Sequence, residues 1–240
     1  MNETLLCVDC GNTRLKWGLH RDGAWLAQGA LPLAEAESVD EVLPERPEKA
    51  IACNVAGPAM AQALVLAADR LHAPLAWVHA HARQCGVTNR YQQPSQLGAD
   101  RWAALIGARS LHQGPCLVVG AGTATTVDLL DRDGVFQGGL ILPGLTLMRN
   151  ALAANTAGLP DAAGTPQDFP RNTADAIASG CLEATLGAIE RFFRRLPEEA
   201  DALCLLSGGA AGELASGLAL PHRIVDNLVL EGLARIAEEV

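Results

Sequence analysis

The chain of 240 residues contains an internal repeat, and this repeat restricts the possible folds more than any other feature. A shift of 111 residues places Gly11 on Gly122 and the turn signal Arg21-Asp22-Gly23 on Arg132-Asp133-Gly134. Each copy has three short apolar runs separated by two tight turns, which is typical of a β-meander. Helices and single strands follow each copy. The sequence therefore predicts two similar α/β domains with a cleft between them, where ligands are commonly bound.

The expected domains cover residues 1–113 and 114–240, with the last helix able to pack back on the first domain. Residues 31–48 are acidic and contain proline, so we expect them to contribute little to the core. Asn172 is expected to cap a long helix over 173–196, because apolar residues recur there every three or four positions. The expected strands are 5–10, 14–19, 24–30, 50–54, 75–79, 117–119, 125–130, 135–141, 202–206 and 223–225. Further helices are expected at 58–71 and from residues 100, 143, 210 and 228.

Composition and charge exclude several classes of protein. Hydrophobic residues make up 49% of the chain, which indicates a folded core, and the formal net charge of −9 opposes binding to nucleic acid. No apolar run approaches the ~18 residues of a membrane span, and the N-terminus lacks the pattern of a signal peptide. The seven scattered cysteines do not resemble a disulfide scaffold. We expect a cytoplasmic protein with free thiols that binds neither nucleic acid nor membrane.

The segment Asp9-Cys10-Gly11-Asn12-Thr13-Arg14-Leu15-Lys16 follows a buried strand and has the chemistry of a phosphate loop. A carboxylate at a strand end can hold Mg²⁺, directly or through water, together with substrate phosphates. Gly11 lets the backbone approach a phosphate, and Asn12, Thr13 and Lys16 supply donors. The alternative is a hairpin in which these residues only form the turn.

The second copy has a matching segment, Gly120-Ala121-Gly122-Thr123-Ala124-Thr125-Thr126. Its glycines and hydroxyls suit a phosphate-binding turn. It is not a Walker A loop, because no Gly-Lys-Ser/Thr follows at the required spacing. Thr-rich β-structure without a ligand is the alternative. Ser207-Gly208-Gly209 either approaches a nucleotide closely or forms a tight turn from strand to helix.

A third segment runs from Tyr91 to Trp102, and in it Asp100 stands where a loop meets a helix. Asp100 could serve as a general base, with Arg101 beside it to attract an anionic substrate. Its more common role at such a position is an N-cap. Cys7 and Cys10, and likewise His79 and His81 with Cys85, have spacings found in metal sites, but structural roles are favoured for both groups.

Taken together, the segments resemble type III pantothenate kinase. Besides the first loop and Tyr91-x-x-Pro94, the matching pieces run in the family's order over nearly the whole chain. They are Gly98-Ala99-Asp100-Arg101, Gly122 to Asp128, Gly138 to Gly144, Thr156 to Pro160, Asn172-Thr173, Ser179-Gly180 and Ser207-Gly208-Gly209.

The resemblance implies two duplicated RNase H-like domains of the acetate and sugar kinase/Hsc70/actin superfamily. It implies a homodimer that phosphorylates pantothenate with ATP and Mg²⁺ to 4′-phosphopantothenate, the first step of coenzyme A synthesis. Residues Asp9 to Lys16 would bind the phosphates of ATP, Asp9 would hold Mg²⁺, and Thr123 would contact ATP. Asp100 would accept the proton of the substrate. The implied pantothenate contacts are Tyr91, Gly98, Ala99, Asp100, Arg101 and Thr173.

The chain departs from the family pattern at Gly120, where the family usually has an aspartate that helps to bind a monovalent cation. The internal repeat also shows the missing carboxylate, because the shift of 111 residues places Asp9 on Gly120. We therefore expect weakened dependence on K⁺ or NH₄⁺. Two alternative functions are a non-enzymatic accessory factor for transcription on the same fold and a kinase for another small hydroxylated metabolite. Retention of Asp100 and of the first loop argues against the former, and the segment from Tyr91 to Arg101 argues against the latter.

Overall fold

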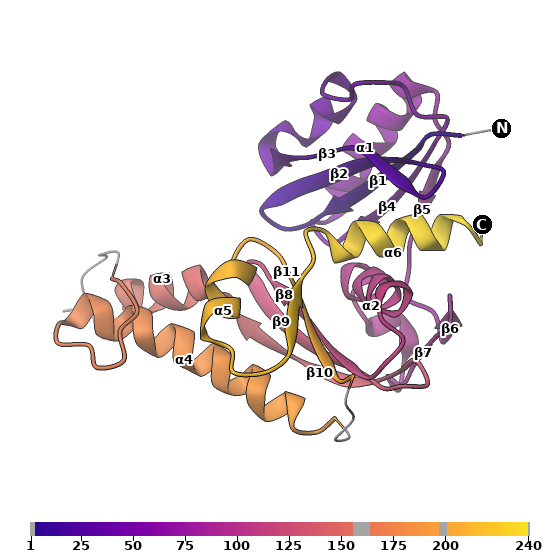
Figure 1. Ribbon diagram of the computed structural model, residues 1–240. Helices are drawn as coiled ribbons and strands as arrows, with labels where there is room; N and C mark the ends of the chain where they lie inside the picture. The colour runs from indigo at the N-terminus through magenta and orange to yellow at the C-terminus, as the bar shows by residue number, and fades with distance from the viewer. Residues whose placement is uncertain (1–2, 156–163, 197–200, 240) are drawn as a thin grey trace. The chain divides into compact units, whose positions relative to one another are not determined.

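The computed structural model describes residues 3–155, 164–196 and 201–239 of the chain (Figure 1). It divides the chain into two compact units. Unit 1 consists of Met1–Gln113 together with Asn227–Val240, and unit 2 consists of Gly114–Asp226. The chain enters unit 2 once and leaves it once, so the C-terminal segment belongs to the same unit as the N-terminus.

Unit 1 contains a five-stranded sheet in the order β3-β2-β1-β4-β5. The meander β1 (Leu5–Cys10), β2 (Arg14–Arg21) and β3 (Ala24–Pro32) is antiparallel, while β4 (Lys49–Asn54) and β5 (Leu75–Trp77) continue the sheet in parallel. Strands that are parallel need a crossover connection, and α1 (Pro58–Leu71) supplies the one between β4 and β5. Pro58 fits the first turn of α1, because that position needs no backbone donor.

Alternation along β1 divides the core of unit 1 between the two faces of the sheet. Leu6, Val8 and Cys10 pack in one cluster with α1 residues such as Leu64 and Ala67. The intervening side chains face the other side, where α2 (Ala99–Leu111) and α6 (Leu228–Ala237) pack closely against each other (Figure 1). Asp9 belongs to the second set and therefore lies on the α2 side of the sheet.

Glycines allow α2 and α6 to approach at backbone distance. A Cβ atom on Gly232 would overlap the backbone carbonyl of Ala103. A Cβ atom on Gly107 would lie 2.9 Å from the backbone nitrogen of Gly232. Because neither helix has a side chain at the crossing point, α6 can pack directly on the helix that carries Asp100.

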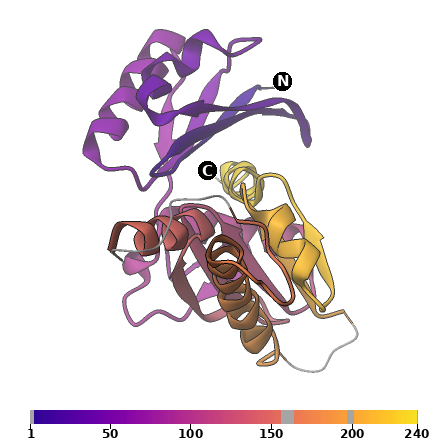
Figure 2. The same cartoon turned by 90° about the vertical axis from the view of Figure 1, so that its left-hand side faces the viewer.

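Unit 2 repeats the topology of unit 1. Its five strands run in the order β12-β11-β8-β9-β10, with an antiparallel meander followed by parallel strands. They are β8 (Cys116–Ala121), β9 (Ala124–Leu130), β10 (Val135–Pro143), β11 (Leu203–Ser207) and β12 (His222–Ile224). The helices are α3 (Leu145–Asn155), α4 (Thr173–Phe193) and α5 (Ala211–Gly217), and Figure 2 shows α4 lying along one face of this sheet.

Asn172 caps α4 as its sequence predicts, because its side chain accepts a hydrogen bond from the backbone N–H of Asp175 at 2.9 Å. The buried residues of α4, among them Leu182, Leu186 and Ile189, pack against the sheet of unit 2. The helix ends at Phe193, three residues before the predicted end, although Leu196 is still buried.

The register of the two meanders differs at the first turn. Cys10 pairs with Leu15 in unit 1, whereas Ala121 pairs with Thr125 in unit 2, so the second turn is one residue shorter. The shift of 111 residues therefore fails for the second strand. As a result, Lys16 lies opposite Asp9 in unit 1, and Thr126 lies opposite Gly120 in unit 2.

Two local predictions were wrong. Residues 31–48 contribute to the core, because the 3₁₀ helix η1 (Leu33–Glu41) buries Ala36 and Val39 completely. Leu33, Ala36 and Val39 recur at every third residue, and all three pack in the unit 1 core although the backbone departs from helical geometry at Ser38. A short hairpin of β6 (Arg83–Gln84) and β7 (Val87–Asn89) was also missed. Within the described parts of the chain, no helix combines the length and hydropathy needed to cross a membrane.

Candidate active site

Asp9 is a buried carboxylate near the end of β1, with 8% of its surface exposed. It lies opposite Lys16 on β2 and opposite Cys53 on β4, and the Cys53 thiol donates a hydrogen bond to Oδ1 at 3.5 Å. Burial raises the pKa of Asp9 to about 6, although the positive charge of Lys16 acts to lower it. The negative charge of Asp100 raises this pKa further. Asp9 and Asp100, which are far apart in sequence, are thus electrostatic neighbours within unit 1.

The turn after β1 presents polar side chains to solvent. The backbone N–H of Gly11 donates to the carbonyl of Arg14 at 3.2 Å, which closes the turn. Asn12, Thr13 and Arg14 are exposed there. The side chains of Cys10 and Leu15, which the resemblance includes in the phosphate loop, lie in the core. These two residues can offer only backbone groups to a ligand.

Asp100 lies in the first turn of α2 and does not cap the helix, so the N-cap interpretation is wrong. The N-cap is Gly98, and Oδ1 of Asp100 accepts the N–H of the next residue, Arg101, at 2.8 Å. A Cβ atom on Gly98 would lie 2.5 Å from that Oδ1. The absence of a side chain at Gly98 therefore leaves room for the carboxylate beside the α2 terminus, where the helix dipole favours negative charge.

Arg101 links α2 to the loop that precedes it. Its side chain is buried, with 7% exposure, and Nη1 donates to the hydroxyl of Tyr91 at 3.1 Å. The guanidinium carbon lies 5.8 Å from the centre of the Tyr91 ring, within range of a cation–π contact. Tyr91, Asp100 and Arg101 therefore form one continuous cluster in unit 1.

The second predicted loop lies in unit 2, at the turn between β8 and β9. The backbone N–H of Gly144 donates to the carbonyl of Thr123 at 2.9 Å, and the turn at Gly208 approaches Ala121 from β11. Cβ atoms on Gly144 or Gly208 would overlap the backbone of this loop. The three glycine-containing segments singled out in the sequence thus meet at one end of the unit 2 sheet, with Thr123 exposed.

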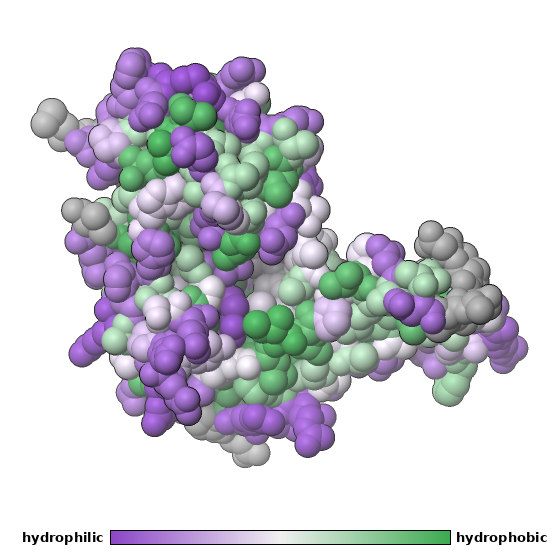
Figure 3. All heavy atoms as spheres, turned by 180° about the vertical axis from the view of Figure 1, so that it is seen from behind, coloured by the Kyte–Doolittle hydropathy of each residue, from purple (hydrophilic) through white to green (hydrophobic). Residues whose placement is uncertain are grey.

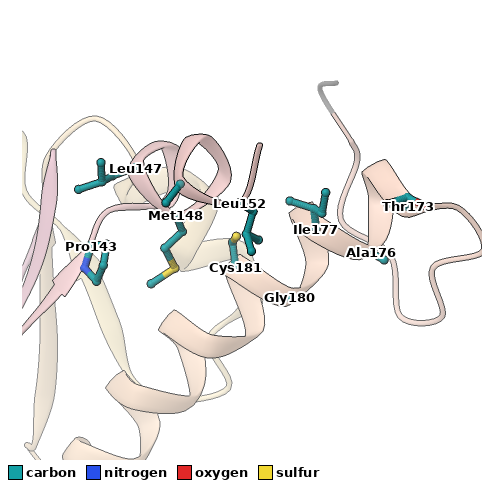
Figure 4. A pocket seen from close by; sticks show the side chains of 10 residues that line it. Pro143, Leu147, Met148, Leu152, Thr173, Ala176, Ile177, Gly180 and Cys181 are labelled. Carbon is teal, nitrogen blue, oxygen red and sulfur yellow. The ribbon is translucent and has the colours of Figure 1, made fainter. Parts of the chain in front are cut away.

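Thr173 lies apart from that loop, at the start of α4. It borders an apolar groove of about 660 Å³ between α3 and α4, which Pro143, Met148 and Ile177 help to line (Figure 4). Figure 3 shows apolar surface on this part of unit 2. Among the described residues that line the groove, Thr173 and the Cys181 thiol supply the polar side chains.

A family model described as type III pantothenate kinase matches residues 5–195. A type III pantothenate kinase from Aromatoleum aromaticum is 54% identical over 237 residues, which cover 98% of both chains. The chain belongs to the type III pantothenate kinase family. A second such kinase, from Dechloromonas aromatica, is 49% identical over 97% of this chain and 98% of that relative. This member of the type III pantothenate kinase family is therefore a kinase, as its sequence predicted.

Solved structures show how widely the fold of this type III pantothenate kinase is shared. A putative transcriptional activator of the Baf family from Campylobacter jejuni has a TM-score of 0.67 at 20% identity, with 98% of both chains covered. A putative 2-dehydro-3-deoxygalactonokinase from Sinorhizobium meliloti has a TM-score of 0.61 at 15% identity, with the same coverage. These likenesses concern the fold alone. Together with the repeated topology they confirm the predicted class of two duplicated RNase H-like, actin-like ATPase domains.

Sequence reasoning missed one side chain at the site of this type III pantothenate kinase. Cys53 lies within the apolar strand β4 and carries no motif, so only the register of β1 against β4 reveals it as the partner of Asp9. Its buried thiol is held neutral, because burial raises its pKa well above the usual range and both Asp9 and Asp100 add to the effect. The motif from Thr156 to Pro160 lies outside the described residues.

Replacing Gly98 with alanine should reduce the turnover of this type III pantothenate kinase by tenfold or more without a large loss of stability. The backbone of Gly98 has φ −55° and ψ 138°, which alanine adopts readily, so the main effect is displacement of the Asp100 carboxylate. If Asp100 is a catalytic group, its misplacement by ~1 Å can cost roughly 100-fold in rate. The measurement is kcat together with the thermal midpoint.

A double-mutant cycle tests that explanation. If Gly98→Ala acts through Asp100, it should have almost no further effect on kcat in an Asp100→Asn background. Additive losses of kcat would show that Gly98 matters for another reason. Gly187→Ala is the control, because its added Cβ would meet nothing within 4 Å.

Replacing Asp9 with asparagine should stabilise the metal-free protein above pH 6 while removing most activity. The pKa of Asp9 is about 6 in the folded protein against 3.8 as its ordinary value, so folding opposes its ionisation. A difference of this size corresponds to about 2–3 kcal/mol of unfolding free energy. The wild type is expected to gain that stability as the pH falls from 6 towards 3.8, because the folded state then binds the proton.

Urea unfolding with a metal chelator, at about pH 7.5 and about pH 5, measures this difference. The variant should exceed the wild type in unfolding free energy by more at the higher pH than at the lower pH. A variant less stable than the wild type at both values would contradict the conclusion that burial of the Asp9 charge is unfavourable.

Proposed function

We propose that this chain transfers the γ-phosphoryl group of ATP to the 4′-hydroxyl of pantothenate, which yields 4′-phosphopantothenate and begins coenzyme A synthesis. The observation that carries the proposal is the cluster of Tyr91, Asp100 and Arg101, together with the Asp100 charge that acts on the buried Asp9 carboxylate. These residues give unit 1 both a candidate phosphate loop and a candidate base. Membership in the family supplies the substrate.

Asp100 acts as the general base in this proposal. The 4′-hydroxyl is a weak nucleophile until its proton is accepted in the transition state, and a positioned carboxylate typically contributes roughly 10²–10⁴-fold. Strong basicity is unnecessary, because phosphoryl transfer depends mainly on positioning and charge stabilisation. The Arg101 N–H and the space at Gly98 fix the carboxylate for this role.

The remaining residues bind the two substrates. Donors of the segment from Asp9 to Lys16, the Lys16 ammonium above all, would offset phosphate charge, and Thr123 would contact ATP. Tyr91, Gly98, Ala99, Arg101 and Thr173 would contact pantothenate. Because the Arg101 guanidinium donates to the Tyr91 hydroxyl, we propose that it helps to form the pantothenate pocket.

Asp9 fits Mg²⁺ by its chemistry. Its carboxylate is buried, the negative charge of Asp100 raises its pKa and Lys16 lowers it, so the burial of this carboxylate favours an added positive charge. Mg²⁺ commonly takes one or two carboxylates and completes its shell with phosphates and water. When bound, the ion would neutralise phosphate charge, while Asp9 holds it in place and Cys53 fixes the Asp9 oxygen.

Turnover should persist in buffer without K⁺ and NH₄⁺, because Gly120 replaces the family's usual aspartate. A Cβ atom on Gly120 would lie 2.8 Å from the Thr126 hydroxyl, so the Thr126 side chain occupies the space that a carboxylate would need. Rates in Na⁺, K⁺ and NH₄⁺ salts at equal ionic strength test this expectation. A steep loss of activity in Na⁺ would contradict it.

A coupled assay of ADP release with and without pantothenate tests the proposed reaction. Pantothenate-dependent release, with phosphopantothenate identified as product, is the expected result. Folded protein without such release would refute the reaction and favour a non-enzymatic regulator. Release with another hydroxylated metabolite but not with pantothenate would reassign the substrate.

We also propose a cytoplasmic homodimer, which the family resemblance implies. Size-exclusion chromatography with light scattering measures the oligomeric state. A monomer at assay concentrations that retains full turnover would contradict the dimer.

A further inference from the structure

Asn89 is a buried amide whose two polar groups both bind the loop that carries Tyr91. Only 7% of the residue is exposed. Its Oδ1 accepts the backbone N–H of Tyr91 at 3.0 Å, and its Nδ2 donates to the backbone carbonyl of Pro94 at 3.2 Å. Its own backbone N–H donates to the carbonyl of Ala82 at 2.9 Å, which ties it to the hairpin of β6 and β7.

We infer that Asn89 is a positioning residue for the pantothenate pocket, which sets the place of Tyr91 without touching the substrate itself. The inference rests on the proposed function, in which Tyr91 contacts pantothenate. It adds a residue that neither the motifs nor the family resemblance assigns. Asn89 stands two positions before the motif and was not distinguished by its sequence.

The chemistry explains why asparagine suits this position. The contact with Tyr91 is an Asx turn, in which a side-chain oxygen binds the N–H two residues further on. The contact with Pro94 requires a donor on the same side chain. Among side chains as short as that of asparagine, only an amide supplies an acceptor and a donor on two different atoms. Alanine would leave the Tyr91 N–H and the Pro94 carbonyl without these partners, and unmade buried hydrogen bonds are costly.

The loop held by Asn89 is fixed at its far end by α2. Pro94 begins the short helix η2 (Pro94–Gln96), and Leu97 beyond it is buried. The Trp102 side chain, which is fully buried in α2, donates to Gln84 of the hairpin at 3.1 Å. Asn89 therefore joins two anchored elements, and Tyr91 lies between them where it meets Arg101.

The chain contains a single tyrosine, so Tyr91 can be observed alone. Incorporation of 3-fluorotyrosine gives one ¹⁹F resonance that reports the surroundings of its ring. This signal depends on the place of Tyr91 and not on catalysis. It therefore separates a failure of the inference from a failure of the proposed function.

The experiment compares Asn89→Ala and Asn89→Ser with the wild type, with Gln92→Ala as an exposed control in the same loop. Asn89→Ala should shift the ¹⁹F resonance and raise KM for pantothenate roughly tenfold, as expected for lost buried hydrogen bonds. KM for ATP should stay near its wild-type value. Serine can still form the turn to Tyr91, so Asn89→Ser should recover most of the ¹⁹F position and of KM.

Two results would overturn the inference. One is an unchanged ¹⁹F resonance and unchanged KM for pantothenate in Asn89→Ala. The other is an equal rise of both KM values that serine does not reverse, which would mark a purely structural role. Absence of pantothenate-dependent turnover in the wild type would instead refute the proposed function, whatever the resonance shows.

Discussion

Replacement of Asp100 with asparagine should lower kcat by roughly 10²–10⁴-fold, the range that a positioned general base contributes. The amide cannot accept the proton of the 4′-hydroxyl. It keeps nearly the same shape, and its oxygen can still accept the N–H of Arg101. The variant should therefore fold normally and bind ATP. Pantothenate-dependent ADP release and the thermal midpoint measure the two effects separately.

Asp22→Asn is a matched control, because Asp22 lies in the exposed turn between β2 and β3. Its φ of 50° is a conformation that asparagine tolerates well. The control should keep full turnover. Near-normal kcat in Asp100→Asn would show that another group, or water alone, accepts the proton. A collapse of the thermal midpoint would show that Asp100 has a structural role.

Replacement of Gly232 with alanine should destabilise unit 1 by ~3 kcal/mol or more, the upper range for overpacking. The added methyl group would overlap the backbone carbonyl of Ala103, and a helix backbone cannot move as a flexible side chain does. α6 must then shift away from α2 where the two helices cross. A change of this size corresponds to a fall in thermal midpoint of roughly 6–12 °C for a protein of this length.

Tryptophan fluorescence can follow this effect in one unit. All four tryptophans lie in unit 1, at Trp17, Trp25, Trp77 and Trp102. Gly187→Ala in α4 of unit 2 is the control, followed by circular dichroism because all the tryptophans lie in unit 1, and it places the same methyl group in a helix where nothing lies within 4 Å. The control should be neutral or slightly stabilising. Equal midpoints for Gly232→Ala and the wild type would show that α6 is not held at the distance described here.

Most elements could be predicted from the sequence because their signals are local. The apolar runs from Leu5 and Leu117 predict strands, and the spacing of apolar residues over 173–196 predicts α4 with Asn172 as its cap. Turn signals at Asp22-Gly23 and Asp133-Gly134 mark the meanders. The expectation for residues 31–48 was wrong, because an acidic composition concealed Ala36 and Val39, which are completely buried.

Contacts between segments could not be predicted in this way. The hydrogen bond from Cys53 to Asp9 depends on the register of two parallel strands, and that register is fixed by the packing of the whole sheet. The space that Gly98 leaves for Asp100 depends on how the loop enters α2. The one-residue difference between the two turns, which places Thr126 opposite Gly120, also appears only in the pairing of the strands.

The sequence by itself determined the duplicated α/β architecture and the set of candidate residues, because period, turn chemistry and motif order are properties of the chain. Only the tertiary structure decided which of these residues meet. It brought Asp100 within electrostatic range of Asp9, joined Arg101 to Tyr91 and gave Asn89 its two partners in the Tyr91 loop. The physical reason is that burial and hydrogen bonding between distant segments arise only when strands and helices pack together.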